Sequence, residues 1–359
     1  MIHLKTLNKQ QLSEFVSSGE FRKYDFLPIT EHRAKSHIAN PKATDEQTLL
    51  ILAFDDERLA GYLGCFPDHF KIDGIRLNYA WLSTLYIGDQ FRGKRIAQAL
   101  LSKAFEAYDG NIALTEFTKE AESLYNKVGV FQYIQPKTGK RYYFRTDFQT
   151  IIPTKKPDTK SLKPLFGIAD GMINSLISLK NSFKNQPDFK FEVIGKIDSE
   201  SAGFISKFQS NRNADEINSL IENPWVLERE TEDEKYMFSS YAKVFRYFWV
   251  KIYDENNTLI TCSLLLLRDG HLKVSYLFTD SDLSRFIQFL SYFIIKNKVK
   301  ILTSYQAELN KKIEETKGFP KIHERDLERR YLLHQQLLKN LSENFNPNFQ
   351  DGDGDCVMT

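Results

Sequence analysis

A cationic turn between residues 92 and 97 is the part of the sequence best suited to bind a ligand. It reads Arg92-Gly93-Lys94-Arg95-Ile96-Ala97 and lies between an apolar strand pattern that ends at Ile87 and an amphipathic helix pattern. A turn that opens a helix presents unpaired backbone N–H groups and the positive end of the helix dipole to one point. Three cations within four residues exceed what one phosphate needs. The segment therefore predicts a pyrophosphate site with a further phosphate nearby.

Two common nucleotide-binding patterns are excluded. The turn is too short for the glycine-rich loop that binds nucleoside triphosphates, and the dinucleotide-binding G-x-G-x-x-G pattern is absent. The chain has 49 Lys plus Arg against 47 Asp plus Glu, a formal net charge of +2. Such a balance predicts no nucleic-acid footprint, so any anion site must be local.

Strand and helix patterns alternate around the turn. Two strands, 49–54 and 59–66, are expected to form a hairpin across the polar residues 55–58. The pattern then predicts a strand over 81–87, a helix over 96–108, a strand over 112–117 and a helix over 119–128. The turn therefore joins a strand to a helix within an α/β lobe.

The second half of the chain repeats this outline without repeating its residues. Strands are expected at 247–253, 259–267 and 272–278, followed by a helix over 283–296 and a strand over 300–305. Where the first half has its cationic turn, the second has Asp280 and Asp282, which would repel a pyrophosphate. The pattern indicates duplication followed by divergence, although two unrelated α/β lobes would look similar.

The length of the chain and a proline-rich stretch within it predict two folded domains. The chain has 359 residues, of which 42% are apolar and 27% charged. A stretch with three prolines and four lysines, residues 153–164, is expected to be an exposed linker. The expected segments are a catalytic lobe over 1–150, a linker and bridging helix over 151–189, a second lobe over 190–325, and a C-terminal helix with an acidic tail over 326–359.

The cationic turn resembles the signature of the GNAT superfamily of N-acyltransferases, R/Q-x-x-G-x-G/A. Arg92 matches its first position and Ala97 its last, whereas Arg95 replaces the central glycine, which lets the backbone approach the pyrophosphate of coenzyme A. The resemblance implies an α/β fold of the α+β type with two lobes, each a mixed, mostly antiparallel sheet flanked by helices. It implies that acetyl-CoA or another acyl-CoA binds as co-substrate at residues 92–97 and at the preceding strand end, Leu85, Tyr86 and Ile87.

A second stretch, Leu124-Tyr125-Asn126-Lys127-Val128-Gly129, resembles the family's tyrosine followed by a lysine and a glycine turn. The resemblance implies that Tyr125 protonates the departing CoA thiolate. A phenol with a pKa of about 10 is a feasible donor to a thiolate whose conjugate acid has a pKa of about 8.5. Packing of a helical tyrosine beside the turn is the alternative.

Attack by an amine on a thioester also needs a base, because a protonated amine has no lone pair. Glu116, at the end of the strand over 112–117, is the carboxylate expected nearest to the thioester; Asp68 and His69 are the alternatives. The family resemblance implies that backbone N–H groups near Leu85 and Tyr86 stabilise the oxyanion.

The sequence therefore predicts an acyl-CoA-dependent N-acyltransferase that acts on a small primary amine. The layout is similar to bacterial GNAT-like proteins linked to surface polysaccharide assembly, which suggests an amino sugar as acceptor. An aminoacyl-tRNA-dependent transferase of the peptidoglycan-branching type and a non-catalytic binding protein are the alternatives.

Three further expectations concern surroundings and metals. No stretch reaches the ~18 apolar residues of a membrane helix. Three widely spaced cysteines, Cys65, Cys262 and Cys356, predict neither disulfides nor a zinc site and favour a cytoplasmic location. The run Asp351-Gly352-Asp353-Gly354-Asp355 only partly matches a calcium loop, so no metal is expected there.

Overall fold

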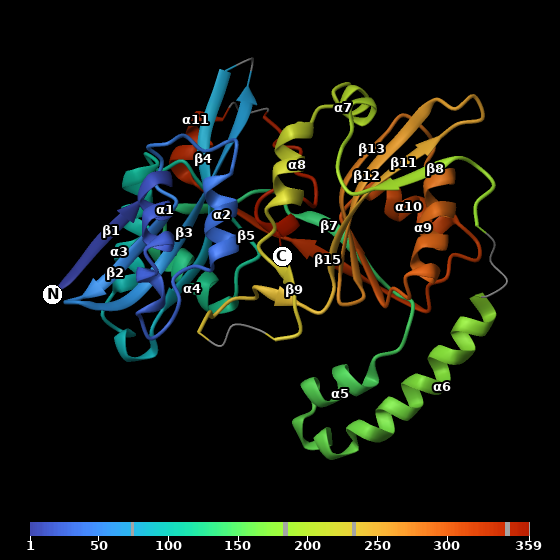
Figure 1. The fold of residues 1–359 in the computed structure, drawn as a ribbon, viewed down its shortest axis with the longest axis horizontal. Helices are drawn as coiled ribbons and strands as arrows, with labels where there is room; N and C mark the ends of the chain where they lie inside the picture. Colours follow the sequence, from blue (N-terminus) through green and yellow to red (C-terminus); the bar gives the residue numbers. More distant parts are fainter. Residues whose placement is uncertain (73–74, 182–185, 232–234, 342–344, 359) are drawn as a thin grey trace. The chain divides into compact units, whose positions relative to one another are not determined.

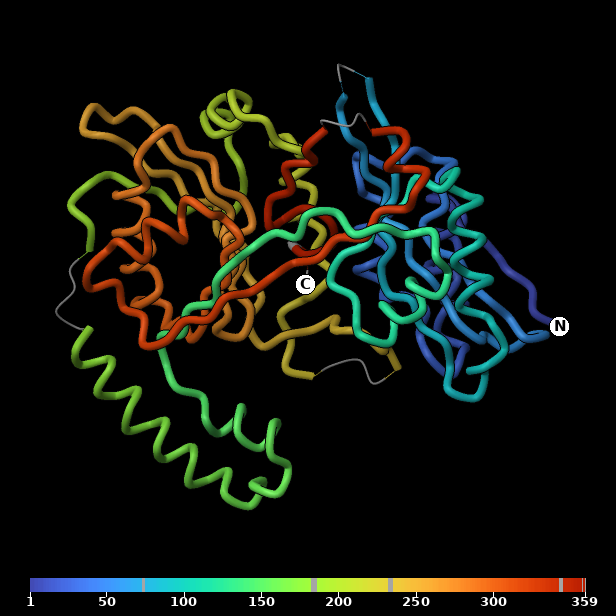
Figure 2. Tube along the Cα trace, turned by 180° about the vertical axis from the view of Figure 1, so that it is seen from behind, coloured from blue at the N-terminus to red at the C-terminus, as the bar shows by residue number. Residues whose placement is uncertain are grey.

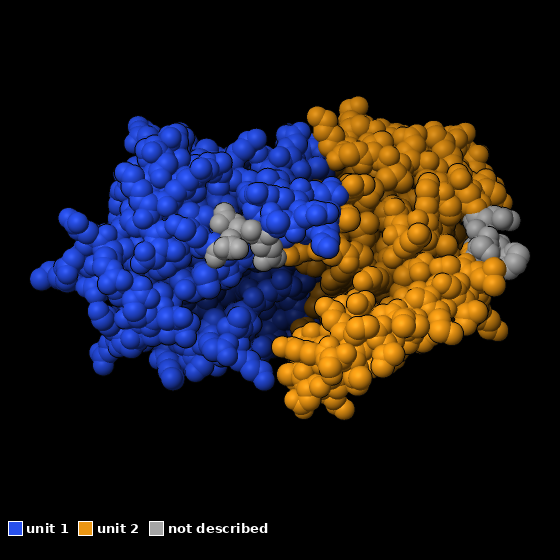
Figure 3. Space-filling model, turned by 60° about the horizontal axis from the view of Figure 1, so that its bottom comes forward, with its two compact units in different colours: residues 1–137, 206–243, 329–359 blue, residues 138–205, 244–328 orange. Residues whose placement is uncertain are grey.

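The computed structural model describes residues 1–72, 75–181, 186–231, 235–341 and 345–358 (Figure 1). The chain divides into two compact units, which Figure 3 distinguishes by colour. Unit 1 contains residues 1–137, 206–243 and 329–359; unit 2 contains residues 138–205 and 244–328. Each unit is therefore assembled from separate stretches of the sequence.

Unit 1 is built on a seven-stranded mixed sheet with the order β1-β2-β3-β4-β5-β16-β6. Its strands are β1 (Ile2–Leu7), β2 (Leu50–Asp55), β3 (Arg58–Ile72), β4 (Ile75–Ile87), β5 (Ile112–Thr115), β16 (Tyr331–His334) and β6 (Phe131–Tyr133). All neighbouring pairs are antiparallel except β4 and β5. A two-stranded ladder of β9 (Leu227–Glu228) and β10 (Tyr241–Ala242) completes its strands.

Four helices of unit 1 begin after a residue whose side chain caps them. Its α-helices are α1 (Lys9–Ser17), α2 (Glu31–Ile38), α3 (Ile96–Ala107), α4 (Lys119–Val128), α8 (Ala214–Glu222) and α11 (Gln335–Asn340). Asn8, Thr30, Thr118 and Asn213 each accept a hydrogen bond from a backbone N–H in the first turn of the helix that follows. Short 3-10 turns are η1 (Glu20–Arg22), η2 (Asp89–Phe91) and η4 (Cys356–Met358).

Unit 2 has a second seven-stranded mixed sheet, with the order β15-β7-β14-β13-β12-β11-β8. Its strands are β7 (Lys137–Tyr143), β8 (Phe191–Ile194), β11 (Phe245–Tyr253), β12 (Leu259–Arg268), β13 (His271–Thr279), β14 (Ile301–Ser304) and β15 (His323–Arg329). Its helices are α5 (Phe148–Lys155), η3 (Pro157–Leu162), α6 (Lys163–Asn181), α7 (Ser199–Ile205), α9 (Ser284–Lys296) and α10 (Ala307–Glu315).

Each sheet takes one strand from the far end of the sequence. In unit 1, β16 lies between β5 and β6, and Leu332 pairs with both Leu114 and Tyr133. In unit 2, β7 lies between β14 and β15, where Leu302 pairs with Tyr142. Figure 2 shows the stretches through β7 and β15 side by side. The seventh strand of each sheet is thus supplied by the half of the chain that builds the other sheet.

The exchanged strands are integral to the cores. Leu332 and Tyr142 are both fully buried and belong to the apolar clusters of unit 1 and unit 2 respectively. In unit 1 this cluster packs α3 against the inner strands through residues such as Leu100 and Ile112. Burying a leucine side chain contributes about 1.5–3 kcal/mol, so the exchange is part of what stabilises each unit.

The expected fold class is confirmed, since each lobe is a mixed, mostly antiparallel sheet flanked by helices. Each strand and helix expected around the cationic turn overlaps an observed one, but β3 continues to Ile72 and β4 begins at Ile75, beyond the expected bounds of 59–66 and 81–87. The exchange of β7 and β16 has no counterpart in the sequence analysis. The stretch 153–164, expected to be a linker, lies in α5, η3 and the start of α6. Among the described residues, no helix is long and apolar enough to cross a bilayer.

The interleaving predicts that residues 1–150 alone do not fold. This fragment lacks β16, so β5 and β6 lose their shared partner, and it lacks the buried Leu332. We expect no cooperative urea transition followed by circular dichroism, while the full chain unfolds cooperatively. In the full chain, Leu332→Ala should cost about 2–5 kcal/mol of unfolding free energy. A cooperative transition of the isolated fragment would contradict the interpretation.

Candidate functional site

The cationic turn leads from η2 into α3 through two left-handed residues. Gly93 has φ +84° and Arg95 has φ +58°, and Ile96 is the first residue of α3. The side chain of Arg95, at the N-cap, makes no capping hydrogen bond. Because the first N–H groups of a helix have no partner within it, the turn presents donors for an anion.

Arg95 holds a conformation that favours glycine. A non-glycine residue there costs roughly 1–2 kcal/mol because its Cβ crowds the backbone. Its side chain is exposed, as are those of Arg92 and Lys94. The turn therefore keeps the left-handed geometry at the position where the family signature has its central glycine.

Two of the three cations already have acidic neighbours. Arg92 pairs with Asp89 at 2.8 Å and Lys94 with Asp55 at 2.6 Å. Among the described residues no ion pair of Arg95 is found. Exposed pairs contribute at most about 1 kcal/mol, so a phosphate can displace these carboxylates.

Beside the turn, β4 separates from β5. The two strands pair only at Ala80 with Ile112 and at Trp81 with Ala113, although β4 continues to Ile87. A bulge also places Thr84, with φ +52°, and Leu85 opposite the single residue Leu63 of β3. Bulges free backbone groups from the ladder. Leu85, Tyr86 and Ile87, all half-buried, thus line the strand end nearest the predicted pyrophosphate site.

Tyr125 lies on α4 and is 4% exposed. Its ring makes edge contacts with Phe117 at 6.0 Å and Phe131 at 5.6 Å between centroids. Burial, and next the negative charge of Asp355, raise the pKa of the Tyr125 phenol. The phenol is therefore protonated throughout the neutral range and can act only as a donor of its proton.

Glu116 follows β5 directly and has a left-handed backbone, φ +51°. Its carboxylate accepts a hydrogen bond of 2.8 Å from Arg329, whose side chain is 4% exposed. Arg329 also forms a buried ion pair with Asp351. Glu116 is thus tied to the C-terminal segment as well as lying near Tyr125's helix.

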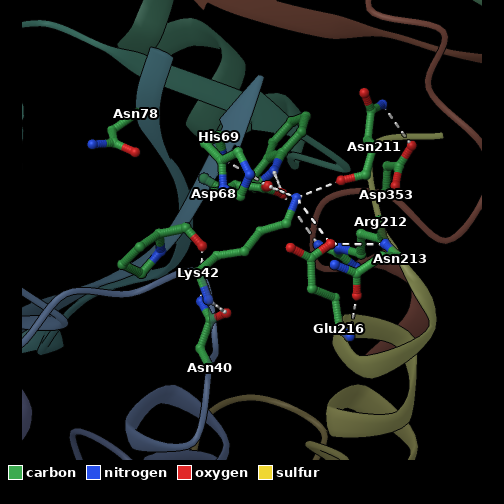
Figure 4. Close-up of polar contacts among 12 residues, drawn as sticks. Asn40, Lys42, Asp68, His69, Asn78, Asn211, Arg212, Asn213, Glu216 and Asp353 are labelled. Atoms are coloured by element: carbon green, nitrogen blue, oxygen red, sulfur yellow. Dashed lines mark hydrogen bonds and ion pairs between the residues drawn. The ribbon is translucent and has the colours of Figure 1, made fainter. Parts of the chain in front are cut away.

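The two alternative bases, Asp68 and His69, lie in a buried polar cluster (Figure 4). Asp68 is 2% exposed and pairs with Lys42 at 2.5 Å and Arg212 at 3.3 Å. It also accepts hydrogen bonds from the indole of Trp81 and the backbone N–H of His69. Burial opposes ionisation of Asp68, but the charges of Lys42 and Arg212 outweigh it and lower its pKa to about 2.

The imidazole of His69 is neutral at pH 7. Burial, and next the charge of Lys42, lower its pKa to about 4. Its Nδ1 is buried and has no hydrogen-bond partner among the described residues. Asp68 is therefore a fixed anion that holds two cations, and neither it nor His69 is poised to exchange a proton with an amine at neutral pH.

Arg212 connects Asp68 to the C-terminal segment. Its guanidinium donates to the carbonyls of Gly352 at 3.0 Å and Gly354 at 3.2 Å, and Asn211 beside it donates to Asp353 at 3.0 Å. The carboxylates of Asp351 and Asp353 thus face protein donors. No group of three or more potential metal-ligating side chains occurs in the described part of the chain.

The C-terminal segment lies against the strands where β4 and β5 diverge. A Cβ at Gly354 would stand 3.2 Å from the Thr115 side chain and 3.5 Å from the Trp81 ring. The next residue, Asp355, is half-buried, and burial, followed by the negative charge of Glu116, raises its pKa to about 6. The segment therefore brings a carboxyl that titrates near neutral pH to the neighbourhood of Tyr125 and Glu116.

The sequence analysis assigned no role in this site to four residues that organise it: Lys42, Arg212, Arg329 and Asp355. Arg212 lies 144 residues from Asp68 along the chain, and Arg329 lies 213 residues from Glu116. No local spacing reports such pairs. The one available signal is the alternation of Asp and Gly over 351–355, which was compared with a calcium loop and interpreted as a solvated tail or a cap.

The first part of the chain is similar to a known protein family. Residues 13–130 match the model of the acetyltransferase (GNAT) family. No curated protein matches the sequence at a significant level.

Solved structures resemble the whole chain. A conserved protein of Enterococcus faecalis described as a probable N-acyltransferase is 11% identical, with 93% of this chain and 73% of that one covered and a TM-score of 0.52. A GCN5-related N-acetyltransferase from Kribbella flavida is also 11% identical, with 94% and 73% covered and a TM-score of 0.51. At this identity the likeness shows the fold alone, which is that of GNAT acyltransferases.

The buried cluster predicts an acid-labile contribution from Asp68. Its folded pKa lies below the ordinary value of 3.8, so its stabilisation is complete above pH 4 and is lost as the pH falls to about 2. The loss should amount to roughly 2 kcal/mol in urea unfolding measured across this range.

Asp68→Asn should remove this pH dependence and cost about 3–5 kcal/mol at pH 7, because it leaves two buried cations without their partner. Asp45→Asn, at a carboxylate that is 87% exposed, is the matched control and should change neither quantity. An Asp68→Asn protein with the wild-type profile would disprove the role of the cluster.

Proposed function

We propose that unit 1 transfers an acyl group from acetyl-CoA or another acyl-CoA to a primary amine. The observation that carries the proposal is the turn at residues 92–97. Gly93 and Arg95 both have a left-handed backbone there. They lead into α3 beside the end of β4 that β5 does not pair. Main-chain N–H groups of this turn would hold the pyrophosphate, and the side chains of Arg92, Lys94 and Arg95 would add charge.

The thioester would lie along the part of β4 that β5 does not pair. A thioester carbonyl develops negative charge when an amine adds to it, and backbone N–H groups can stabilise that charge. The bulge at Thr84 and Leu85 turns the strand at this point, which supports Leu85 and Tyr86 as donors. Ile87 would contact the pantetheine chain at the end of the strand.

Tyr125 would donate a proton to the departing thiolate. Burial keeps the proton on the phenol at neutral pH, where it is available to the thiolate, but the raised pKa also makes the phenol a weaker acid. Because a thiolate leaves readily, the contribution of this donor should be modest, about 10–100-fold in rate.

We infer that Asp355 is the base that accepts the proton of the attacking amine. A base works best when its pKa lies near the working pH, and the pKa of Asp355 is about 6. The groups whose charges act on it come from several elements: Glu116 after β5, Arg33 on α2 and Arg329. Asp355 in turn acts on Tyr125, so the base and the acid would lie in one site.

Glu116 remains the other candidate for the base. Its ion pair with Arg329 supports a positioning role, because Arg329 also holds Asp351 and so links β5 to the segment that carries Asp355. The acceptor class, an amino sugar of surface polysaccharide synthesis, rests on the sequence resemblance alone.

Binding of acetyl-CoA, measured by isothermal titration calorimetry, tests the role of the turn. Wild-type protein should bind acetyl-CoA. Gly93→Val should weaken binding by about tenfold or more, since a β-branched residue disfavours the left-handed backbone. Arg95→Gly keeps that backbone and is the matched control, with an affinity within about threefold of wild type.

Folded wild-type protein that binds no acetyl-CoA at millimolar concentration would overturn the proposal. An aminoacyl-tRNA-dependent transferase and a non-catalytic protein with this fold would then be the remaining functions.

Acetyl transfer to glucosamine, measured as the release of free CoA, tests whether Asp355 or Glu116 is the base. The value of kcat/KM should rise as the pH increases through about 6, where Asp355 loses its proton. Asp355→Asn should lower kcat by about 100-fold or more and abolish this rise, with acetyl-CoA affinity unchanged. Glu116→Gln, the matched variant, should keep the rise near pH 6; its loss in that variant alone would make Glu116 the base.

A further inference from the structure

Helix α6 of unit 2 exposes a row of large apolar side chains. Leu165, Ile168, Met172 and Leu176 are 61%, 62%, 67% and 68% exposed. They are spaced three or four residues apart, so they lie on one side of the helix. Single exposed apolar residues are ordinary on protein surfaces, but an aligned row of four forms a patch that marks an interaction site.

The row is not the face that α6 uses within the unit. The opposite side of α6 holds α5 as a helical hairpin (Figure 1). Asp170, 8% exposed, accepts hydrogen bonds from the first backbone N–H groups of α5, at Phe148 and Gln149. Asn174 bonds both the N–H and the carbonyl of Thr146, each at 2.9 Å. Helix α6 therefore packs against α5 without using the exposed row.

The charge around the row is strongly one-sided. Residues 148–181 contain five lysines and two aspartates, and one of these aspartates is the buried Asp170. The lysines, all exposed, are Lys155, Lys156, Lys160, Lys163 and Lys180. In the described part of the chain none of the five forms an ion pair. They precede and follow the row, so apolar and cationic side chains occupy one hairpin.

We propose that the α5–α6 hairpin docks on an anionic phospholipid bilayer, with α6 lying in the plane of the interface. An amphipathic helix with lysines and exposed leucine, isoleucine and methionine suits this environment, since its apolar face enters the acyl boundary while lysines reach the headgroups.

Charge decides between this occupant and a second copy of the chain. Two hairpins packed through their rows would bring like charges together, with only the exposed Asp158 to offset them in each. An anionic surface instead attracts each lysine. Because this attraction is screened within about 10 Å at 0.1 M salt, the interaction depends on ionic strength.

The test is flotation of the full chain with vesicles, which needs no assumption about catalysis. Wild-type protein should float with vesicles of phosphatidylcholine and phosphatidylglycerol and not with phosphatidylcholine alone. The substitutions Ile168→Ser, Met172→Ser and Leu176→Ser together should reduce the bound fraction by more than about tenfold. Ile75→Ser, at a 73% exposed residue of β4, is the matched control and should bind as wild type does.

A second variant tests the charges. Lys155→Gln, Lys156→Gln, Lys160→Gln and Lys163→Gln together should weaken binding by more than about tenfold and remove most of its salt dependence. Circular dichroism should show that both combined variants stay folded, because every changed side chain is exposed. Equal binding to neutral vesicles would overturn the proposal. A protein that does not float would overturn it too, if sedimentation velocity shows a dimer and the triple serine variant is monomeric.

Discussion

The buried ion cluster at Asp68 is the interaction on which the arrangement of unit 1 depends. One carboxylate, 2% exposed, holds Lys42 and Arg212, and Arg212 holds the carbonyls of Gly352 and Gly354. Three stretches of chain that are far apart in sequence are thereby joined at the end of β3. Taking these charges out of water is costly, so the cluster is stable only when every member has its partner.

The position of the C-terminal segment follows from that cluster. Arg212 from one side and Arg329 from the other hold residues 351–354 against Trp81 and Thr115. Asp355 comes next, in a place where burial and the charge of Glu116 disfavour its ionised form. A carboxyl that would otherwise titrate near pH 4 is thus brought close to neutrality by packing and by one neighbour.

The two exchanged strands impose a similar dependence on the fold. Neither sheet is complete until the opposite end of the chain has arrived, because β16 and β7 each occupy an inner position. An inner strand has both edges paired, so its absence would leave two neighbouring edges open. The exchange also explains why compact units and contiguous segments differ in this chain. Residues 151–181 of the stretch expected to link two lobes belong to a hairpin within unit 2 that Asp170 and Asn174 hold.

Local sequence patterns predict much of the fold. Helix α3 and the strands around it follow from periods of 3.6 and 2, which depend only on near neighbours, and the turn at Gly93 follows from its residue types. Arg95 shows the limit of this reasoning, because its residue type argues against the left-handed backbone that it adopts. The sequence by itself therefore determined the elements and the turn at residues 92–97. Only the tertiary structure decided which strands complete each sheet, which cations meet Asp68, and that Asp355 faces Tyr125's site. Apart from the pair of Lys42 and Asp68, which are 26 positions apart, these pairings join residues more than a hundred positions apart, and their energy comes from burial, which no local pattern records.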